Sequence, residues 1–332
     1  MIEKAPFGSA AGREFSLYTL KNKNGMQVSV TELGGIITSI KVPVDGELRE
    51  CVLGFDAIED YFSEDYQAGY PYLGAIIGRN AGRVGNAQFP LNDKMVSLNA
   101  NHGDHQLHGG AEGFDRKIWQ INILGNETLE LNYNSEDGEE GYPGTVKTTV
   151  RYILSDDNEL TVQYSAETDQ PTVVNLTQHT YFNFNKENSG DILSHRLMVN
   201  SDKFVPLDEN LLPNGEILQV VSSNDYRGGK NPDAELDSSF PLADNEQMAG
   251  SLESPDGKVK MEVYTTQPVL HIYTGYYLPD VQTGGRKAVS KNAGICFEAQ
   301  GFADAPNHPE FKSTILKPGE KYNQQTTFKF LF

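Results

Sequence analysis

One histidine, His179, stands among polar and aromatic residues in the stretch NLTQHTYFNF, residues 175–184. In an extended chain Thr177, His179 and Tyr181 point to the same side, so two hydroxyl groups could fix the tautomer of the imidazole. A buried histidine needs a hydrogen-bond partner for each ring nitrogen or a role that uses them. The stretch therefore predicts either a hydrogen-bonded core histidine or an acid–base group.

A carboxylate, Glu298, follows an apolar run in ICFEAQGF, residues 295–302. Alternation along a strand places Cys296, Glu298 and Gln300 on one face. Burying a carboxylate costs free energy unless it is paired or functional, so Glu298 is a candidate for proton transfer.

Three histidines at intervals of three, His102, His105 and His108, occur in NHGDHQLHGG. On a helix this spacing would present them on one face as zinc ligands, but the flanking Asn and Gly residues are loop signals, so we expect no metal site. His108 differs from the other two because Gly109 and Gly110 follow it and allow the backbone to approach closely beside the ring.

Two arginines lie among turn glycines in IIGRNAGRVGNAQF, residues 76–89. The glycines are not a phosphate loop, because the Lys-Ser/Thr pair and the following helix are missing. Arg79 is expected either to form a buried ion pair that supports the sheet or to bind hydroxyls or a carboxylate of a ligand. Together the four segments supply a set of groups suited to acid–base chemistry on an uncharged polyol.

The elements that must position these groups are strands. Alternation with period two runs through MQVSVTEL, TVKTTVRYIL, ELTVQYSAE and VKMEVYTT, and the turn SDDN makes a hairpin of residues 145–167. Helical signals are few: AIEDYF, residues 57–62, could form one or two turns. Residues 221–258 are polar, with Gly and Pro, and resemble long loops. The pattern predicts an all-β fold, one large antiparallel β-sandwich with few short helices, over a single domain of residues 1–332.

Composition narrows the class of partner. The formal net charge is −19, from 46 acidic and 27 basic residues, and this charge would repel nucleic acids and anionic membranes. The two cysteines, Cys51 and Cys296, have no metal-binding spacing, and no disulfide framework is expected. There is no signal-peptide pattern and no apolar run of about 20 residues, so we expect a soluble, cytoplasmic protein.

The motifs taken together resemble the aldose 1-epimerase (galactose mutarotase) family. They are IIGRNAGRVGNAQF, NHGDHQLHGG, DGEEGYPG, NLTQHTYFNF, FEAQGFADAPNHP and the terminal KPGEKYNQQTTFKF, in family order from about Gly34 to the C-terminus. The resemblance implies a large β-sandwich of the galactose mutarotase type with an open cleft. It also implies an isomerase that interconverts the α and β anomers of free hexoses, such as galactose or glucose, without cofactor or metal.

The same resemblance implies roles for single residues. Glu298 would be the base that takes the proton from the C1 hydroxyl, and His179 the acid that protonates the ring oxygen. His108 would hydrogen-bond the ring oxygen or a neighbouring hydroxyl and share the acid role. A carboxylate, with an ordinary pKa of about 4.3, is ionised at neutral pH, whereas an imidazole near 6.5 is partly protonated. The substrate-binding residues would be Arg79, Asn80, Asp237 and Gln300, with Gln300 holding the base.

The sequence departs from the family pattern in ways that bear on sugar preference. Asp237 retains the carboxylate of a usual Asp-His pair, but Ser238 replaces the histidine. His271 stands where an aromatic residue is common, YTGYY replaces a usual TGN, and ADAP replaces PDAP.

Several alternatives share the resemblance. An epimerase for phosphorylated or acidic sugars would favour more basic residues in the cleft, and a non-catalytic sugar sensor would not need an acid–base pair. A polysaccharide lyase or hydrolase on a related sandwich would ordinarily need a second carboxylate, for which Asp237 is the candidate. The expected partner is a monosaccharide, bound by a monomer or homodimer.

Overall fold

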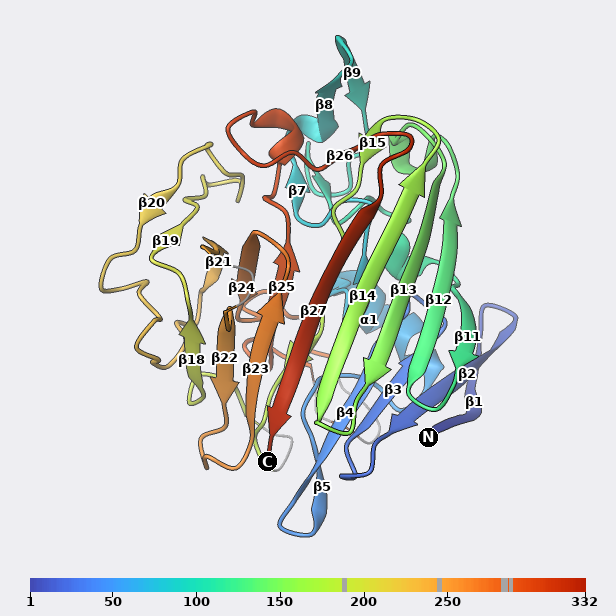
Figure 1. Ribbon diagram of the computed structural model, residues 1–332, viewed down its shortest axis with the longest axis vertical. Helices are drawn as coiled ribbons and strands as arrows, with labels where there is room; N and C mark the ends of the chain where they lie inside the picture. The colour runs from blue at the N-terminus through green and yellow to red at the C-terminus, as the bar shows by residue number, and fades with distance from the viewer. Residues whose placement is uncertain (187–189, 244–246, 282–285, 287–288) are drawn as a thin grey trace.

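The computed structural model describes residues 1–332 except 187–189, 244–246, 282–285 and 287–288. Its largest layer is a sheet of eight strands, which Figure 1 shows as the long arrows across the front. In spatial order these are β11 (Gln120–Leu124), β12 (Thr128–Ser135), β13 (Val146–Leu154), β14 (Glu159–Thr168), β27 (Tyr322–Leu331), β23 (Lys260–Thr265), β22 (Gly250–Glu253) and β18 (Arg196–Val199).

The alternation of apolar residues in the sequence is the reason for these strands. In β13, Val146, Val150 and Tyr152 are fully buried, while Lys147 and Arg151 between them are exposed. The antiparallel pairing of β13 with β14 confirms the predicted hairpin. Neighbouring strands of this sheet are antiparallel throughout, as in a predicted antiparallel sandwich.

Two smaller sheets complete the main layers. One has five strands in chain order: β1 (Ile2–Ala10), β2 (Arg13–Lys21), β3 (Gln27–Thr31), β4 (Ile37–Val44) and β5 (Glu47–Glu50). The other has four strands in the order β17 (Tyr181–Phe182), β25 (Ile295–Gln300), β24 (Val269–Tyr273) and β21 (Asp237–Pro241).

Short paired strands and helices connect these sheets. The pairs are β7 (Arg83–Val84) with β10 (Gln106–Leu107), β6 (Ile76–Ile77) with β16 (Thr177–Gln178), β8 (Gln88–Leu91) with β9 (Lys94–Ser97), β15 (Thr172–Val173) with β26 (Ile315–Leu316), and β19 (Lys203–Phe204) with β20 (Leu218–Gln219). The helices are α1 (Glu64–Gly69) and the 3-10 turns η1 (Ile58–Phe62), η2 (Gly85–Ala87), η3 (Phe114–Arg116), η4 (Glu139–Gly141) and η5 (Ala305–Asn307). The all-β class with few short helices is confirmed, and η1 forms where AIEDYF predicted helical turns.

One prediction about the fold was wrong. Residues 221–258 were expected to be long loops, but they contain the strands β21 and β22. The sequence DSSFP of β21 has little apolar alternation, and its pairing with β24 supplies the hydrogen bonds that define the strand.

The main core joins residues of the large sheet, the five-stranded sheet and one face of the four-stranded sheet. Ile295, Phe297 and Ala299 of β25 belong to it, together with Phe328 of β27. The ring centroids of Phe182 and Phe328 lie 5.3 Å apart across this layer. Because side chains alternate along β25, the residues between those core positions face the other way, where the candidate site lies. None of the helices in the described part of the chain has the length and apolar character needed to cross a bilayer.

Candidate active site

The floor of the site is the face of the four-stranded sheet that points away from the core. Strand pairing places Ser239, His271 and Glu298 in one row across β21, β24 and β25. Asp237, Tyr273 and Cys296 form the next row. Except for Cys296, which is fully buried, these residues line a pocket of about 640 Å³, which other chain segments close from the side.

The base and acid expected from the sequence face each other in this pocket. Oε1 of Glu298 lies 3.6 Å from Nε2 of His179, and both residues are almost fully buried. His179 lies between β16 and β17, where its backbone N–H donates to the carbonyl of Ala75 over 2.9 Å. The backbone thus fixes the imidazole beside the carboxylate, in a place from which bulk water is largely excluded.

The second ring nitrogen of His179 has a partner that the sequence did not predict. Its Nδ1 lies 3.5 Å from Sγ of Cys296, rather than at a hydroxyl of Thr177 or Tyr181. Burial raises the pKa of the Cys296 thiol well above its usual value, so the sulfur keeps its proton at neutral pH.

His108 completes a cluster with these two residues. Its ring centroid lies 5.2 Å from that of His179, with the planes at 90°. Burial lowers the pKa of His108 well below its usual value, and the nearby charge of His179 acts in the same direction. Its Nδ1 accepts a hydrogen bond from the backbone N–H of Gly82 over 3.3 Å, so the neutral ring carries its proton on Nε2.

The glycines after His108 act as the sequence predicted. Gly109 has a φ of +90°, and a Cβ atom there would lie 2.0 Å from the carbonyl oxygen of Gly78. Only a glycine allows this approach, which holds the His108 loop against the Gly78–Arg79 segment.

Asp237 lies at the edge of the pocket with a histidine beside it. His271 donates from Nε2 to Oδ1 of Asp237 over 2.9 Å, and its Nδ1 lies 2.9 Å from the Ser239 hydroxyl. Burial opposes ionisation of Asp237, but the hydrogen bond and positive charge of His271 hold its pKa below the usual value. Burial alone would lower the pKa of His271, but the hydrogen bond to Asp237 and its negative charge together raise this pKa above the usual value.

Two buried polar atoms in the pocket wall have no hydrogen-bond partner. They are Oε1 of Gln300 and Nε of Arg83, and both residues line the pocket. A buried polar group without a partner is uncommon, and a ligand rich in hydroxyl groups would satisfy both. Gln300 therefore faces the pocket, with no hydrogen bond to Glu298 among the described residues. Arg83 was not among the site residues expected from the sequence. In the structure its neighbour Val84 packs into a core cluster, so Arg83 faces the opposite side, toward the pocket.

Arg79 and Asn80 are not among the residues that line this pocket. The guanidinium of Arg79 is buried and donates to the carbonyl oxygens of Ser135, Glu136 and Pro143, and to the hydroxyl of Ser135. Asn80 is fully buried and donates to the carbonyl of Ala81. Arg79 is therefore held by carbonyl and hydroxyl oxygens. Within the described part of the chain, its guanidinium neither forms the ion pair expected from the sequence nor lines the pocket where a ligand would bind.

The backbones of His102 and His105 pair with each other, but the side chains of the histidines in NHGDHQLHGG have different surroundings. His102 lines the rim of the pocket, while Nδ1 of His105 accepts from the backbone N–H of Asn86. The group in the described residues that could hold a metal ion is instead His108, His179 and Glu298, whose ligand atoms lie within 4.8 Å of one another. Two imidazoles and a carboxylate are a known zinc ligand set, and the same three groups are also suited to proton transfer.

A tyrosine-rich segment, residues 61–72, forms one wall of the pocket, called here the tyrosine wall. Tyr70 and Tyr72 line the pocket, and the ring of Tyr72 packs edge-on against His108 at 4.7 Å. Tyr70 packs in turn on Tyr72 at 5.0 Å. These rings exclude water from the side of the pocket where the two histidines lie.

Comparison with known proteins agrees with this geometry. The family model described as aldose 1-epimerase matches residues 16–329. The chain belongs to the aldose 1-epimerase family. It is 38% identical to an aldose 1-epimerase of Haemophilus influenzae over 99% of this chain and 100% of that protein. It is also 38% identical to a galactose mutarotase of Bos taurus, over 98% of this chain and 96% of that protein.

Solved structures of family members have the same fold. An aldose epimerase homologue from C. elegans superimposes with a TM-score of 0.88 at 26% identity, covering 95% of this chain and 98% of that one. A galactose 1-epimerase from Lactobacillus acidophilus gives a TM-score of 0.85 at 28% identity, covering 100% of this chain and 98% of that one. The family and the galactose mutarotase type of sandwich that the sequence suggested are both confirmed.

Proposed function

We propose that the protein interconverts the α and β anomers of free hexoses, with Glu298 as the base and His179 as the acid. The observation that carries the proposal is the buried pair itself, with 3.6 Å between Nε2 of His179 and Oε1 of Glu298. A sugar whose C1 hydroxyl and ring oxygen lie against this pair would contact a proton acceptor and a proton donor at the same time.

The reaction follows from these two contacts. Glu298 takes the proton from the hydroxyl on C1, and His179 gives a proton to O5. The C1–O5 bond breaks, and the electron pair of the O1–H bond forms the aldehyde carbonyl. Rotation about C1–C2 presents the other face of the carbonyl, and O5 adds to it while returning its proton to His179. Protonated Glu298 then protonates O1, so both groups recover their initial states.

His108 and the polar wall would orient the sugar. The Nε2–H of His108 is a donor for the ring oxygen or a neighbouring hydroxyl, because Nδ1 is occupied by the N–H of Gly82. We assign the remaining contacts with sugar hydroxyls to Asp237, Gln300 and Arg83. In this proposal Arg83 takes the binding role that the sequence suggested for Arg79, because it lines the pocket.

A neutral monosaccharide fits the charges of the pocket better than a sugar phosphate. The described lining contains one arginine, Arg83, and two carboxylates, Asp237 and Glu298. A phosphate group would ordinarily need several donors of positive charge. Galactose and glucose are therefore the first substrates to test, in line with the name of the Bos taurus relative. We also propose that residues 1–332 form one domain, working in the cytoplasm as a monomer or homodimer.

The test is the rate of anomer exchange. Pure α-D-galactose or α-D-glucose is dissolved in buffer, and optical rotation is followed with wild-type protein, with Glu298→Gln and without protein. We expect faster approach to the same final rotation, slowed by roughly 100-fold or more in Glu298→Gln. Activity that survives prolonged treatment with a chelator supports proton transfer by side chains, whereas loss and recovery with zinc would assign the three residues to a metal. Folded protein without activity on any common aldose would favour a sugar sensor.

A further inference from the structure

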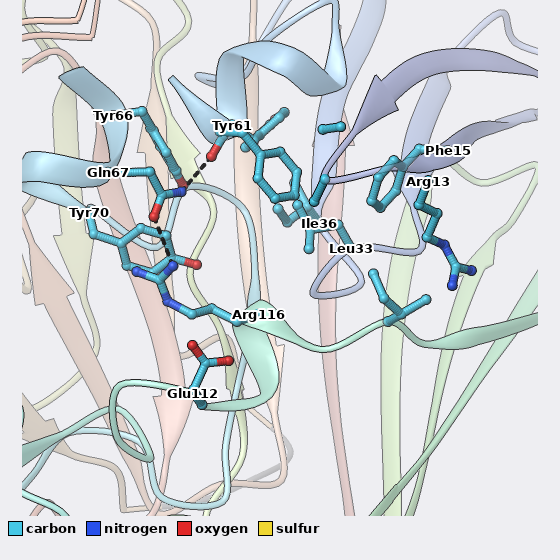
Figure 2. A pocket seen from close by; sticks show the side chains of 14 residues that line it. Arg13, Phe15, Leu33, Ile36, Tyr61, Tyr66, Gln67, Tyr70, Glu112 and Arg116 are labelled. Carbon is cyan, nitrogen blue, oxygen red and sulfur yellow. Dashed lines mark hydrogen bonds between the residues drawn. The ribbon is translucent and has the colours of Figure 1, made fainter. Parts of the chain in front are cut away.

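A second pocket, of about 350 Å³, lies beside the segment that forms the tyrosine wall. Tyr61, Tyr66 and Gln67 of this segment face the second pocket, and Tyr70 lines both pockets. Figure 2 shows its side chains, which come from β1, β2, the connection between β3 and β4, η1, α1 and the region around η3. The proposed sugar chemistry uses none of these side chains apart from Tyr70.

The interior of the second pocket is apolar and fixed. Phe15, Leu33, Ile36 and Tyr61 line it, are buried, and belong to one hydrophobic cluster. Tyr61 and Tyr66 pack edge-to-face with ring centroids 5.6 Å apart. Such a preformed apolar cavity releases water when a ligand of matching shape enters.

Two arginines and one glutamate stand around this apolar interior. Arg116 and Arg13 lie on opposite sides of the pocket, and Glu112 lies near Arg116 (Figure 2). These three side chains give one net positive charge in a protein whose formal net charge is −19. One positive charge next to an apolar cavity complements a single anionic group on an apolar ligand.

The guanidinium of Arg116 is held in place. It lies 3.6 Å from the ring centroid of Tyr70, and it donates from NH1 to Oε1 of Gln67 over 2.8 Å. Gln67 is fixed in turn, because its Nε2 donates to the carbonyl of Tyr61 over 2.7 Å. Oδ2 of Asp115 lies 4.0 Å from Nε of Arg116, on the side of the guanidinium that carries Nε. An arginine arranged in advance loses little conformational entropy when it binds a carboxylate.

We propose that the second pocket binds a small monocarboxylate with an aromatic or branched apolar body. The carboxylate would accept hydrogen bonds from Arg116 and lie within the field of Arg13. The apolar body would rest on Phe15, Leu33 and Ile36. The single net charge of the surrounding groups disfavours a phosphate dianion, and Glu112 would repel a second anionic group.

The test is calorimetric titration of the intact protein with 4-phenylbutyrate, and with 4-phenylbutanol as its uncharged counterpart. We expect 4-phenylbutyrate to bind with a dissociation constant of about 1 mM or lower, and 4-phenylbutanol to bind roughly tenfold more weakly. Arg116→Met and Arg13→Met should each weaken the binding of 4-phenylbutyrate, and Ile118→Trp should abolish it by filling the pocket. Circular dichroism checks that each variant is folded; Arg13 is exposed, so its variant tests the charge without disturbing the core.

Arg83→Met is the matched control, because Arg83 lines the catalytic pocket and not the second one. We expect this variant to bind 4-phenylbutyrate like the wild type, and saturating D-galactose not to displace the ligand. The proposal is overturned if folded wild-type protein gives no binding heat, if the alcohol binds as well as the acid, or if Arg83→Met rather than Arg13→Met and Ile118→Trp removes binding. None of these readouts depends on mutarotase activity.

Discussion

His271 donates a hydrogen bond from Nε2 to Oδ1 of Asp237 over 2.9 Å, from the neighbouring strand. The sequence had Ser238 where a histidine beside Asp237 was expected. Asp237 and Ser239 line the catalytic pocket, whereas Ser238 does not, because side chains alternate along β21. An imidazole next to the aspartate is therefore supplied by β24 instead.

We expect His271→Phe to raise KM for the aldose roughly 10-fold while kcat changes little. The variant leaves the half-buried carboxylate of Asp237 without the donor on His271, so its hydrogen bonds to sugar hydroxyls are no longer oriented. Initial rates from polarimetry over a range of α-D-galactose concentrations give both constants. Ser239→Ala, which removes only the contact at Nδ1, is the control and should have a smaller effect. A fall in kcat with unchanged KM would show that His271 acts on the reaction itself.

Local pattern predicted most of the fold and only part of the site. The hairpin of β13 and β14 follows from alternation within one stretch, and Cys296, Glu298 and Gln300 share a face of β25 as alternation required. The contact of His271 with Asp237 depends on the pairing of two strands distant in sequence, and no local pattern contains it.

The arginines illustrate the same limit. Arg79 and Arg83 both stand among glycines, so residue type and spacing do not distinguish them. Their roles depend on tertiary contacts: the carbonyl oxygens of Ser135 and Pro143 surround Arg79, whereas Val84 packs into a core cluster and leaves Arg83 facing the pocket.

These two arginines should therefore respond differently to the same substitution. Arg83→Met is expected to raise KM by roughly 10-fold or more, with little change in melting temperature, because it removes a donor from the pocket. Arg79→Met should lower the free energy of unfolding by about 3 kcal/mol, because three backbone carbonyls lose their buried donor. Thermal melts and steady-state rates of the two variants provide the comparison. A stable Arg79→Met protein with a raised KM would return the binding role to Arg79.

The two histidines are expected to differ as well. His179→Ala should lower kcat by roughly 100-fold or more, because it removes the proposed proton donor to O5. His108→Gln should retain much of the activity, because the pKa of His108 is lowered by burial and the neutral ring acts only as a hydrogen-bond donor, which an amide can replace. Polarimetry on folded variants separates these effects. The assignment fails if His179→Ala keeps near wild-type kcat while His108→Ala abolishes it.

The last prediction concerns Asp115, a buried carboxyl group beside Arg116. Burial raises the pKa of Asp115 to about 7, against the opposing effects of Tyr70 and Arg116. In the unfolded chain an aspartate has a pKa of about 3.9. Between these values the folded protein keeps a proton that the unfolded chain releases, so the contribution of Asp115 to the free energy of unfolding decreases as pH rises and levels off above about pH 7.

Asp115→Asn has a similar shape and does not titrate, so it should remove this dependence. The difference in the free energy of unfolding, variant minus wild type, should increase by on the order of 3 kcal/mol from pH 5 to pH 8, because only the wild type loses stability as the pH rises. Urea unfolding followed by circular dichroism at several pH values measures this difference. The substitution itself also changes the free energy of unfolding by an amount that does not depend on pH. This amount cancels when only the change between two pH values is compared. If the two proteins instead show parallel stability curves over this range, Asp115 is already ionised in the folded protein at pH 5.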